Sequence, residues 1–96
     1  MMTDMVNTRE LALNILLQIE KEKVPSHMAI RQMLEKYQFL PKQDRAFITR
    51  LCEGSVEYQI QNDYVINQYS KVKIHKCKPV IRTLLRMSVY QIRFMD

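Results

Sequence analysis

The stretch that decides the fold is the end of the chain, Pro79-Val-Ile-Arg-Thr-Leu-Leu-Arg-Met-Ser-Val-Tyr-Gln-Ile-Arg-Phe-Met-Asp96. Proline has a preset φ and no N–H group, so Pro79 suits the first turn of a helix. No later residue of this stretch breaks a helix. The sequence therefore predicts a helix from Pro79 to Asp96.

The predicted helix has two apolar sides and one basic side. At about 100° per residue, one apolar side, expected to face the core, consists of Ile81, Leu84, Leu85, Ser88, Ile92 and Met95. The other apolar side consists of Val80, Met87 and Phe94. The basic side between them consists of Arg82, Arg86 and Arg93, with Tyr90 beside them. This pattern is typical of a central helix packed on both flanks, so we expect the fold to be truncated after it, with one flank uncovered.

The length and composition restrict the protein class. Ninety-six residues form at most one modest domain, and 47% apolar with 26% charged residues is ordinary for a globular protein. One glycine and three prolines leave few residues for hairpin turns, so the sequence predicts an all-α fold. No apolar run reaches the roughly 18 residues that span a bilayer, and no signal pattern is present. We expect a cytoplasmic protein.

The N-terminal half predicts two helices. Residues 1–6 are expected to be a frayed lead, followed by a helix that Asn7 or Thr8 caps and that ends near Glu22. A second helix is expected from Ser26, its cap, to about residue 38. The predicted inner residues are Leu11, Ala12, Ile15, Leu16 and Ile19 in the first helix and Ile30, Met33, Leu34 and Tyr37 in the second.

The middle of the chain has an apolar pattern over residues 40–69, with Phe47, Ile48, Leu51 and Cys52 as its inner stripe. The stretch is either one long bent helix, which the pattern favours, or two helices divided near Asn62-Asp63. Gly54 lies inside it and costs about 1 kcal/mol relative to alanine. We expect the close approach of another helix backbone to compensate for this cost.

The sequence offers little for catalysis or metal binding. Cys52 and Cys77 lack the spacing of a zinc site or a disulfide framework; Cys52 is expected to be buried and Cys77 to be a free thiol in a basic loop. His27 and His75 have no partner residues spaced as metal ligands or as a nucleophile and its base. One glycine cannot form a glycine-rich cofactor loop. These residues are therefore not a catalytic unit by themselves.

The positive charge is concentrated in the last third of the chain. Residues 1–63 contain eight Lys/Arg and nine Asp/Glu, whereas residues 64–96 contain seven Lys/Arg and one acid. The stretch 70–78 is a lysine-rich connection that can neutralise phosphates, and Tyr69 or Tyr90 can supply a stacking surface for a base. A solvated basic loop without a ligand is the alternative. Membrane binding is disfavoured because the apolar faces are needed for the core.

Three motifs, in this order and spacing, resemble a known family. They are Asn7-Thr-Arg-Glu-Leu-Ala-Leu-Asn-Ile-Leu16, Asp44-Arg-Ala-Phe-Ile-Thr-Arg-Leu-Cys-Glu-Gly54 followed by Asn62-Asp-Tyr-Val-Ile66, and the final helix with Leu84-Leu-Arg86 and Tyr90-Gln91. The chain from about residue 7 to 96 resembles the NusB-like domain. The resemblance is greatest to the NusB-like domain at the N-terminus of bacterial 16S rRNA cytosine-5 methyltransferases.

This resemblance implies an all-α, antiparallel helical bundle that spans residues 1–96 and binds RNA. Further helices and a methyltransferase domain that uses S-adenosylmethionine and cysteine chemistry would follow it, so this chain would hold no cofactor and no catalytic residue. The implied partners are rRNA, the absent catalytic domain and a second copy bound through Val80, Met87 and Phe94. The expected RNA contacts are Lys71, Lys73, Lys76, Lys78, Arg82 and Arg86, with Arg45 and Arg50 as weaker candidates. Arg45 and Arg86 also suit structural ion pairs.

Two other functions remain open. One is a free-standing transcription antitermination factor of the NusB type, which binds RNA together with a ribosomal protein. The other is a helical protein-interaction module with no RNA ligand, whose binding would be insensitive to salt and to reversal of the basic charges.

Overall fold

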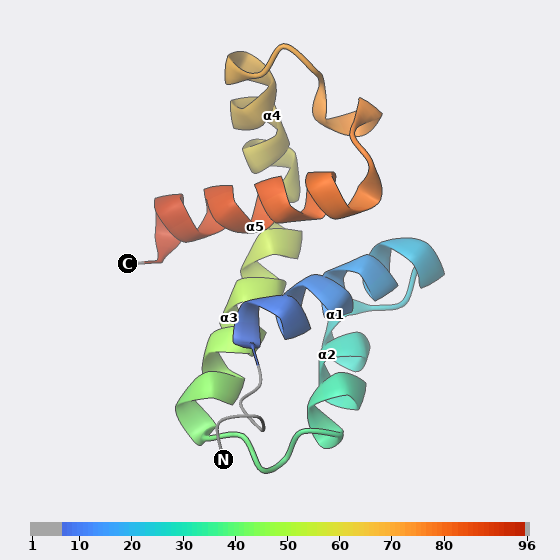
Figure 1. The fold of residues 1–96 in the computed structure, drawn as a ribbon, viewed down its shortest axis with the longest axis vertical. Helices are drawn as coiled ribbons and strands as arrows, with labels where there is room; N and C mark the ends of the chain where they lie inside the picture. The colour runs from blue at the N-terminus through green and yellow to red at the C-terminus, as the bar shows by residue number, and fades with distance from the viewer. Residues whose placement is uncertain (1–6, 96) are drawn as a thin grey trace.

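In the computed structural model, residues 7–95 are described, and they form five α-helices, a short 3₁₀ turn and no strand. The elements are α1 (Thr8–Glu22), α2 (Ser26–Glu35), α3 (Lys42–Glu57), α4 (Gln59–Tyr69), the 3₁₀ turn η2 (Ile74–Lys76) and α5 (Pro79–Phe94) (Figure 1). The all-α prediction is confirmed. The expected frayed lead and the last residue of the predicted final helix lie outside the described residues.

The first helix begins and ends on identifiable backbone signals. The Asn7 side chain accepts a hydrogen bond of 3.1 Å from the Glu10 N–H, which confirms Asn7 as the cap. Lys23 ends the helix in the left-handed conformation, with φ of 58°, and its N–H donates to the Ile19 carbonyl. The following Val24-Pro25 cannot continue the helix.

The second helix is shorter than expected. It ends at Glu35, and residues 36–39 form turns that lead to the buried Leu40. Ser26 is the first helical residue and not the cap; Pro25 precedes the helix, and its carbonyl accepts from the Met28 and Ala29 N–H groups. The predicted cap was wrong because Pro25 already has the extended backbone that starts the helix.

The middle stretch forms two helices, not one bent helix. The break falls at Tyr58, where φ is −101° and ψ is 18°, and not at Asn62-Asp63. Tyr58 still donates to the Gly54 carbonyl and accepts from Asn62, so the interruption is a single residue. Figure 1 shows α4 continuing the general course of α3 beyond the point where α5 crosses.

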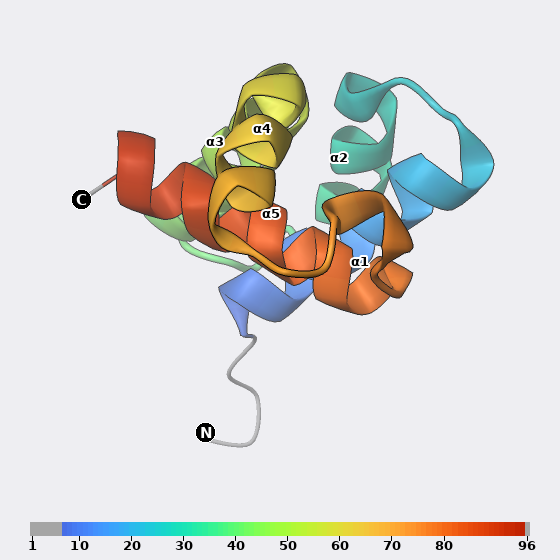
Figure 2. The same cartoon turned by 90° about the horizontal axis from the view of Figure 1, so that it is seen from above.

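The core lies where α1, α2, α3 and α5 meet (Figure 2). Its centre is formed by residues with almost no exposed surface, among them Ile15, Ile48, Leu51 and Cys52. The predicted inner faces of the first three helices are thus confirmed. Burial raises the pKa of the Cys52 thiol to about 12, which keeps it protonated.

Gly54 and Tyr90 pack closely where α3 meets α5. A Cβ atom on Gly54 would overlap the Tyr90 ring, so the glycine leaves the space that the ring occupies. The compensating partner is therefore an aromatic side chain and not a helix backbone. Tyr90 and Phe94 also pack with Tyr58, whose ring centroid lies 4.5 Å from that of Phe94.

The side of α5 that we expected to be uncovered faces the core, and the side that we expected to face the core is largely exposed. Met87 and Tyr90 are buried and Phe94 is half-buried against the core, whereas Ile81 is 50% and Ile92 is 82% exposed. The reason is the space above Gly54, which admits Tyr90 and turns the Met87 side of the helix inward. Helical periodicity alone cannot distinguish two apolar sides of similar width.

The dimer surface expected from the sequence is also wrong. Met87 is only 2% exposed, so Val80, Met87 and Phe94 cannot form a contact with a second copy. An apolar side of α5 is nevertheless exposed, but it is mainly the side that we expected to face the core. Its exposed residues are Val80, Ile81, Leu84, Ser88 and Ile92.

Candidate nucleic-acid interface

The basic connection between α4 and α5 is held to the body of the domain by Asn67 and Ile74. The Ile74 side chain is buried, and its N–H donates to Asn67 Oδ1 at 2.8 Å. Lys73 Nζ donates to the Asn67 carbonyl at 3.3 Å, and the Ser70 hydroxyl bonds with the Val72 backbone. Residues 70–78 therefore form a connection with a defined backbone, although no long helix runs through them.

The four lysines of this connection are exposed. They are Lys71, Lys73, Lys76 and Lys78. Within the described residues, none of the four forms an ion pair with an acid, so their charges face solvent. The backbone of residues 70–78 runs from the far end of α4 down to the start of α5 (Figure 1), so the four lysines are spread along this connection.

Arg82 differs from these lysines because it is bound within the fold. Its Nε and Nη2 atoms donate to the two carboxylate oxygens of Glu20, each at 3.0 Å, and its Nη1 donates to the Cys77 carbonyl at 2.7 Å. Hydrogen bonding to Arg82 lowers the pKa of Glu20, and the same bond raises the pKa of Arg82. Arg82 thus joins α1 to α5 and anchors the end of the connection.

Arg86 and Arg93 are also engaged inside the molecule. Arg86 forms a two-point contact with Asp63, with both distances 2.8 Å, and lies 3.6 Å from a Glu20 oxygen. Arg93 Nη1 donates to Asn62 Oδ1 at 2.7 Å. The structural role that we expected as an alternative for Arg86 is therefore observed.

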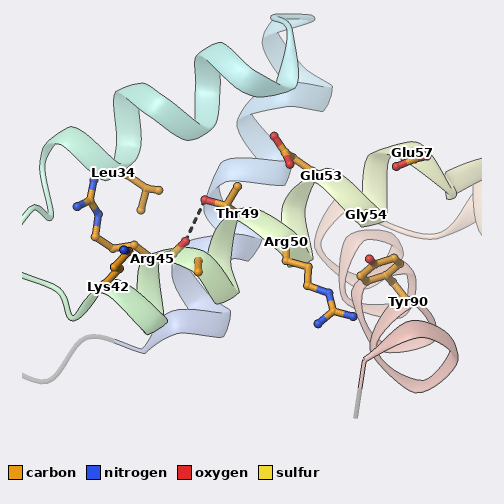
Figure 3. A pocket seen from close by; sticks show the side chains of 10 residues that line it. Leu34, Lys42, Arg45, Thr49, Arg50, Glu53, Gly54, Glu57 and Tyr90 are labelled. Carbon is orange, nitrogen blue, oxygen red and sulfur yellow. Dashed lines mark hydrogen bonds between the residues drawn. The ribbon is translucent and has the colours of Figure 1, made fainter.

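The two weaker candidates lie on α3, beside a separate open hollow of about 550 Å³ (Figure 3). Arg45 extends toward Leu34 at one end of the hollow, whereas Arg50 extends toward Tyr90 and donates to the Phe94 carbonyl at 2.9 Å. Among residues 7–95, Arg45 forms no ion pair and its Nε has no hydrogen-bond partner. Lys42, Glu53 and Glu57 also line the hollow, which therefore has mixed charge.

The structure separates the predicted site into three groups. The four lysines share the connection of residues 70–78, Arg82 and Arg86 are neutralised by acids beside them, and Arg45 and Arg50 lie on α3 away from the connection (Figure 1). Tyr90 is buried and cannot stack on a base, whereas Tyr69 is 89% exposed.

Sequence reasoning missed the partners of the basic side of α5. Glu20 and Asp63 lie 62 and 23 residues away from the arginines that they bind, so no local pattern points to them. Asn67 was missed as the anchor of the connection for the same reason. Glu20 and Asp63 can be recognised as the partners of these arginines only from the tertiary structure.

The described residues do not fit S-adenosylmethionine. Gly54 is the one glycine of the sequence, and it lies within α3 beneath Tyr90, so no glycine-rich loop can cradle the cofactor. Within residues 7–95, no group of three or more His, Cys, Asp or Glu side chains is placed to hold a metal ion. No helix of that range has the length and apolar character needed to cross a membrane.

Comparison with known proteins gives similar proteins of two kinds. The chain is 34% identical over 92 residues to a probable ribosomal RNA small subunit methyltransferase B of Synechocystis sp., and the match covers 96% of this chain and 20% of that protein. It is 28% identical to the protein of the same description in Bacillus subtilis, with 94% and 20% covered. It is 29% identical to the transcription antitermination protein NusB of Acetivibrio thermocellus, with 93% and 61% covered. No solved structure matches the chain significantly.

The chain thus spans about a fifth of the length of the two methyltransferase relatives. The family model described as the NusB family matches residues 6–96, which is almost the whole sequence. The all-helical architecture agrees with this match, and the three motifs lie in α1, in α3 with α4, and in α5. This chain belongs to the NusB family.

Proposed function

We propose that this chain is an RNA-binding domain that holds 16S ribosomal RNA for a cytosine-5 methyltransferase. The observation that carries the proposal is the set of four exposed lysines on the anchored connection between α4 and α5. The names of two relatives support ribosomal RNA as the ligand. Methyl transfer from S-adenosylmethionine would take place on a separate catalytic domain, because these residues fit no such cofactor. Since the partner is ribosomal RNA, the proposed place of action is the cytoplasm.

The lysines suit phosphate binding for an electrostatic reason. Each is exposed and none is paired with an acid in the described part of the chain, so contact with a phosphate displaces no internal ion pair. Lysine ammonium groups that neutralise phosphates release counterions from the RNA, and this release favours binding at low salt. The anchor at Asn67 limits the conformational freedom that the connection loses on binding.

Arg82 and Arg86 have a different part in this proposal. To contact a phosphate, Arg82 would have to leave Glu20 and Arg86 would have to leave Asp63. Each arginine is held by its acid in a two-point contact. We therefore assign them to positioning the start of α5, which carries Lys78 at its N-terminal end. Arg45 and Arg50 remain candidates for a second RNA contact beside the hollow on α3.

The proposal is tested with a double charge reversal, Lys71→Glu with Lys76→Glu, which leaves the Lys73–Asn67 hydrogen bond in place. We expect weaker binding to a 16S rRNA fragment. We also expect the slope of log affinity against log salt to fall by about 0.7 to 0.9 for each lost phosphate contact. Binding is measured by titration at several salt concentrations.

The matched control is Arg31→Glu with Lys36→Glu, which makes the same charge change at two exposed positions in and after α2. This control should retain most of the affinity and the full salt slope. Equal RNA affinities for the wild type and the Lys71/Lys76 variant at every salt concentration would show that the connection does not contact the RNA.

A second candidate function is that of a transcription antitermination factor, which the likeness to the NusB protein of Acetivibrio thermocellus favours. Its RNA would be a transcript, bound together with a ribosomal protein. Competition between a 16S rRNA fragment and an antiterminator transcript distinguishes the two functions. Preference for the transcript, increased by ribosomal protein, would favour this second function.

A further inference from the structure

We propose that a cavity between α1, α3, α4 and α5 takes up a single unstacked base of the bound RNA. This inference rests on the proposed RNA function and adds to it the place where the domain reads the RNA sequence. The cavity has a volume of about 230 Å³, and its walls come from all four helices. It shares no lining residue with the hollow on α3.

The inside of the cavity combines apolar surface with hydroxyl groups. Leu16, Ile19 and Val56 supply the apolar surface. Ser55 and Thr83 also line the cavity and are only 3% and 4% exposed. Among residues 7–95, the Ser55 hydroxyl has no hydrogen-bond partner. A buried hydroxyl without a partner is unfavourable, so its presence in a cavity wall indicates a ligand that completes its hydrogen bonding.

Arg86 gives the cavity a flat group on which a base can stack. Its Nε and Nη2 atoms donate to the two carboxylate oxygens of Asp63, both at 2.8 Å, and such bonds lie at the edge of the guanidinium plane. They do not use the faces of the plane, on which RNA bases stack. Gln59 lines the cavity too, and its amide can both donate to and accept from the edge of a base. A base could therefore bind without breaking the contact between Arg86 and Asp63.

The size and charge of the cavity favour a base over a phosphate. Its volume of about 230 Å³ is below the roughly 300 to 1,000 Å³ of pockets for drug-sized ligands, so it has room for one ring system and not for a whole nucleotide. Glu20 in its wall is bound by Arg82 and lies 3.6 Å from Arg86, so these charges balance one another. An interior of this kind suits an uncharged ring, whereas a phosphate would lose its hydration there.

The cavity is close to the lysines that hold the RNA backbone in the proposed function. Arg82 joins the two: it binds Glu20 in the cavity wall at 3.0 Å and the Cys77 carbonyl, between Lys76 and Lys78, at 2.7 Å. Figure 1 shows the connection reaching the start of α5 just above the C-terminal half of α1. Sequence-specific RNA recognition commonly uses unstacked bases of single strands. A strand held by these lysines can therefore turn one base into the cavity.

The test is an abasic scan of a single-stranded 16S rRNA fragment, in which one nucleotide at a time loses its base and keeps its phosphate. We expect one position at which loss of the base weakens binding to the wild-type chain by about tenfold. The slope of log affinity against log salt should stay the same at that position, because no phosphate contact is lost. Affinities are measured by titration at several salt concentrations.

Two variants connect the sensitive base to the cavity. Gln59→Ala removes an amide from the cavity wall, and Thr83→Val removes a hydroxyl while keeping a β-branched side chain. We expect each variant to bind the intact RNA about threefold or more weakly than the wild type and to lose much of the abasic effect. Gln32→Ala, at an exposed position of α2, is the matched control and should keep both the affinity and the abasic effect. Circular dichroism establishes that the variants remain folded.

A second measurement needs no variant. Intact RNA should shift the NMR amide signals of Ser55, Gln59 and Thr83, which line the cavity, and RNA that lacks the sensitive base should shift them much less. Both RNAs should shift the amide signals of Lys71 and Lys76 equally, since both keep every phosphate. The two sets of signals thus separate base binding from phosphate binding.

Two results would overturn this inference and leave the RNA function in place. One is salt-dependent RNA binding by the wild-type chain that no single abasic position weakens. The other is a sensitive position whose effect is the same in the wild type, Gln59→Ala and Thr83→Val, which would place the base elsewhere on the chain. By contrast, a wild-type chain that binds no RNA would reject the proposed function, and this inference with it.

Discussion

At the scale of single residues, Gly54 and Tyr90 explain how α5 packs on α3. The absent side chain at Gly54 leaves room for the Tyr90 ring, and this contact decides which side of α5 turns inward. The single glycine of the chain is therefore a packing residue. Its unfavourable helix propensity is offset by the burial of a large aromatic side chain.

A substitution at Gly54 tests this explanation. Gly54→Ala improves helix propensity by about 1 kcal/mol, but its methyl group overlaps the Tyr90 ring, and overpacking costs about 1 to 3 kcal/mol or more. We expect a lower free energy of unfolding, measured by urea denaturation. In a Tyr90→Leu background the same substitution should be much less harmful, since the ring is gone. Stabilisation by Gly54→Ala in the wild-type background would contradict the contact.

At the scale of elements, the basic connection of residues 70–78 is held by one side chain, that of Asn67. Asn67 Oδ1 accepts the Ile74 N–H, and Ile74 places its buried side chain beneath the connection. The four lysines therefore project from a fixed backbone and not from a free loop. The sequence of residues 70–78 alone suggested only a basic loop.

Removal of the Asn67 amide should loosen the connection. In Asn67→Ala the Ile74 N–H loses its partner, which costs about 1 kcal/mol, while α1, α3 and α5 keep their packing. We expect faster hydrogen exchange at the Ile74 amide, measured by NMR, together with reduced RNA affinity. Asn14→Ala, on an exposed position of α1, is the control. Unchanged exchange at Ile74 would show that Asn67 does not hold the connection.

At the scale of the whole molecule, α5 is joined to α1 and α4 through acids on those helices. Glu20 on α1 binds Arg82 and lies near Arg86, and Asp63 on α4 binds Arg86. The three contacts tie helices that are distant in sequence to the same side of α5. They also remove two arginines from the positive surface, which leaves the lysines of the connection as the main unpaired basic group at that end.

Because of these ion pairs, we expect the free energy of unfolding to depend on pH. In the folded state, hydrogen bonding to Arg82 lowers the pKa of Glu20. The ion pair therefore stabilises the fold at pH values above the ordinary glutamate pKa of about 4.3. This stabilisation is lost as the pH falls through the lowered pKa of Glu20. Glu20→Gln should reduce stability by about 1 kcal/mol at pH 7, a modest amount because a third of the Glu20 side chain is exposed. The difference from the wild type should shrink below about pH 4.

The measurement is thermal or urea unfolding of both proteins between neutral and acid pH. Glu35→Gln, at an exposed position on α2, serves as the control and should show a smaller effect throughout. If the free energies of unfolding of Glu20→Gln and the wild type differ by the same amount across this pH range, the ion pair is not the source of the difference.

The sequence by itself determined the all-α class, the starts of α1 and α5 and the inner faces of the first three helices, because each depends on neighbours within a few residues. It did not determine the break at Tyr58, where one bent helix was expected. It also determined that the positive charge lies in the last third of the chain. Only the tertiary structure decided which apolar side of α5 faces the core and which arginines are neutralised. Both outcomes depend on residues far away in the chain, Gly54 for the first and Glu20 with Asp63 for the second. Periodicity reports that a helix has two apolar sides, but only the shape and charge of the surface it meets select between them.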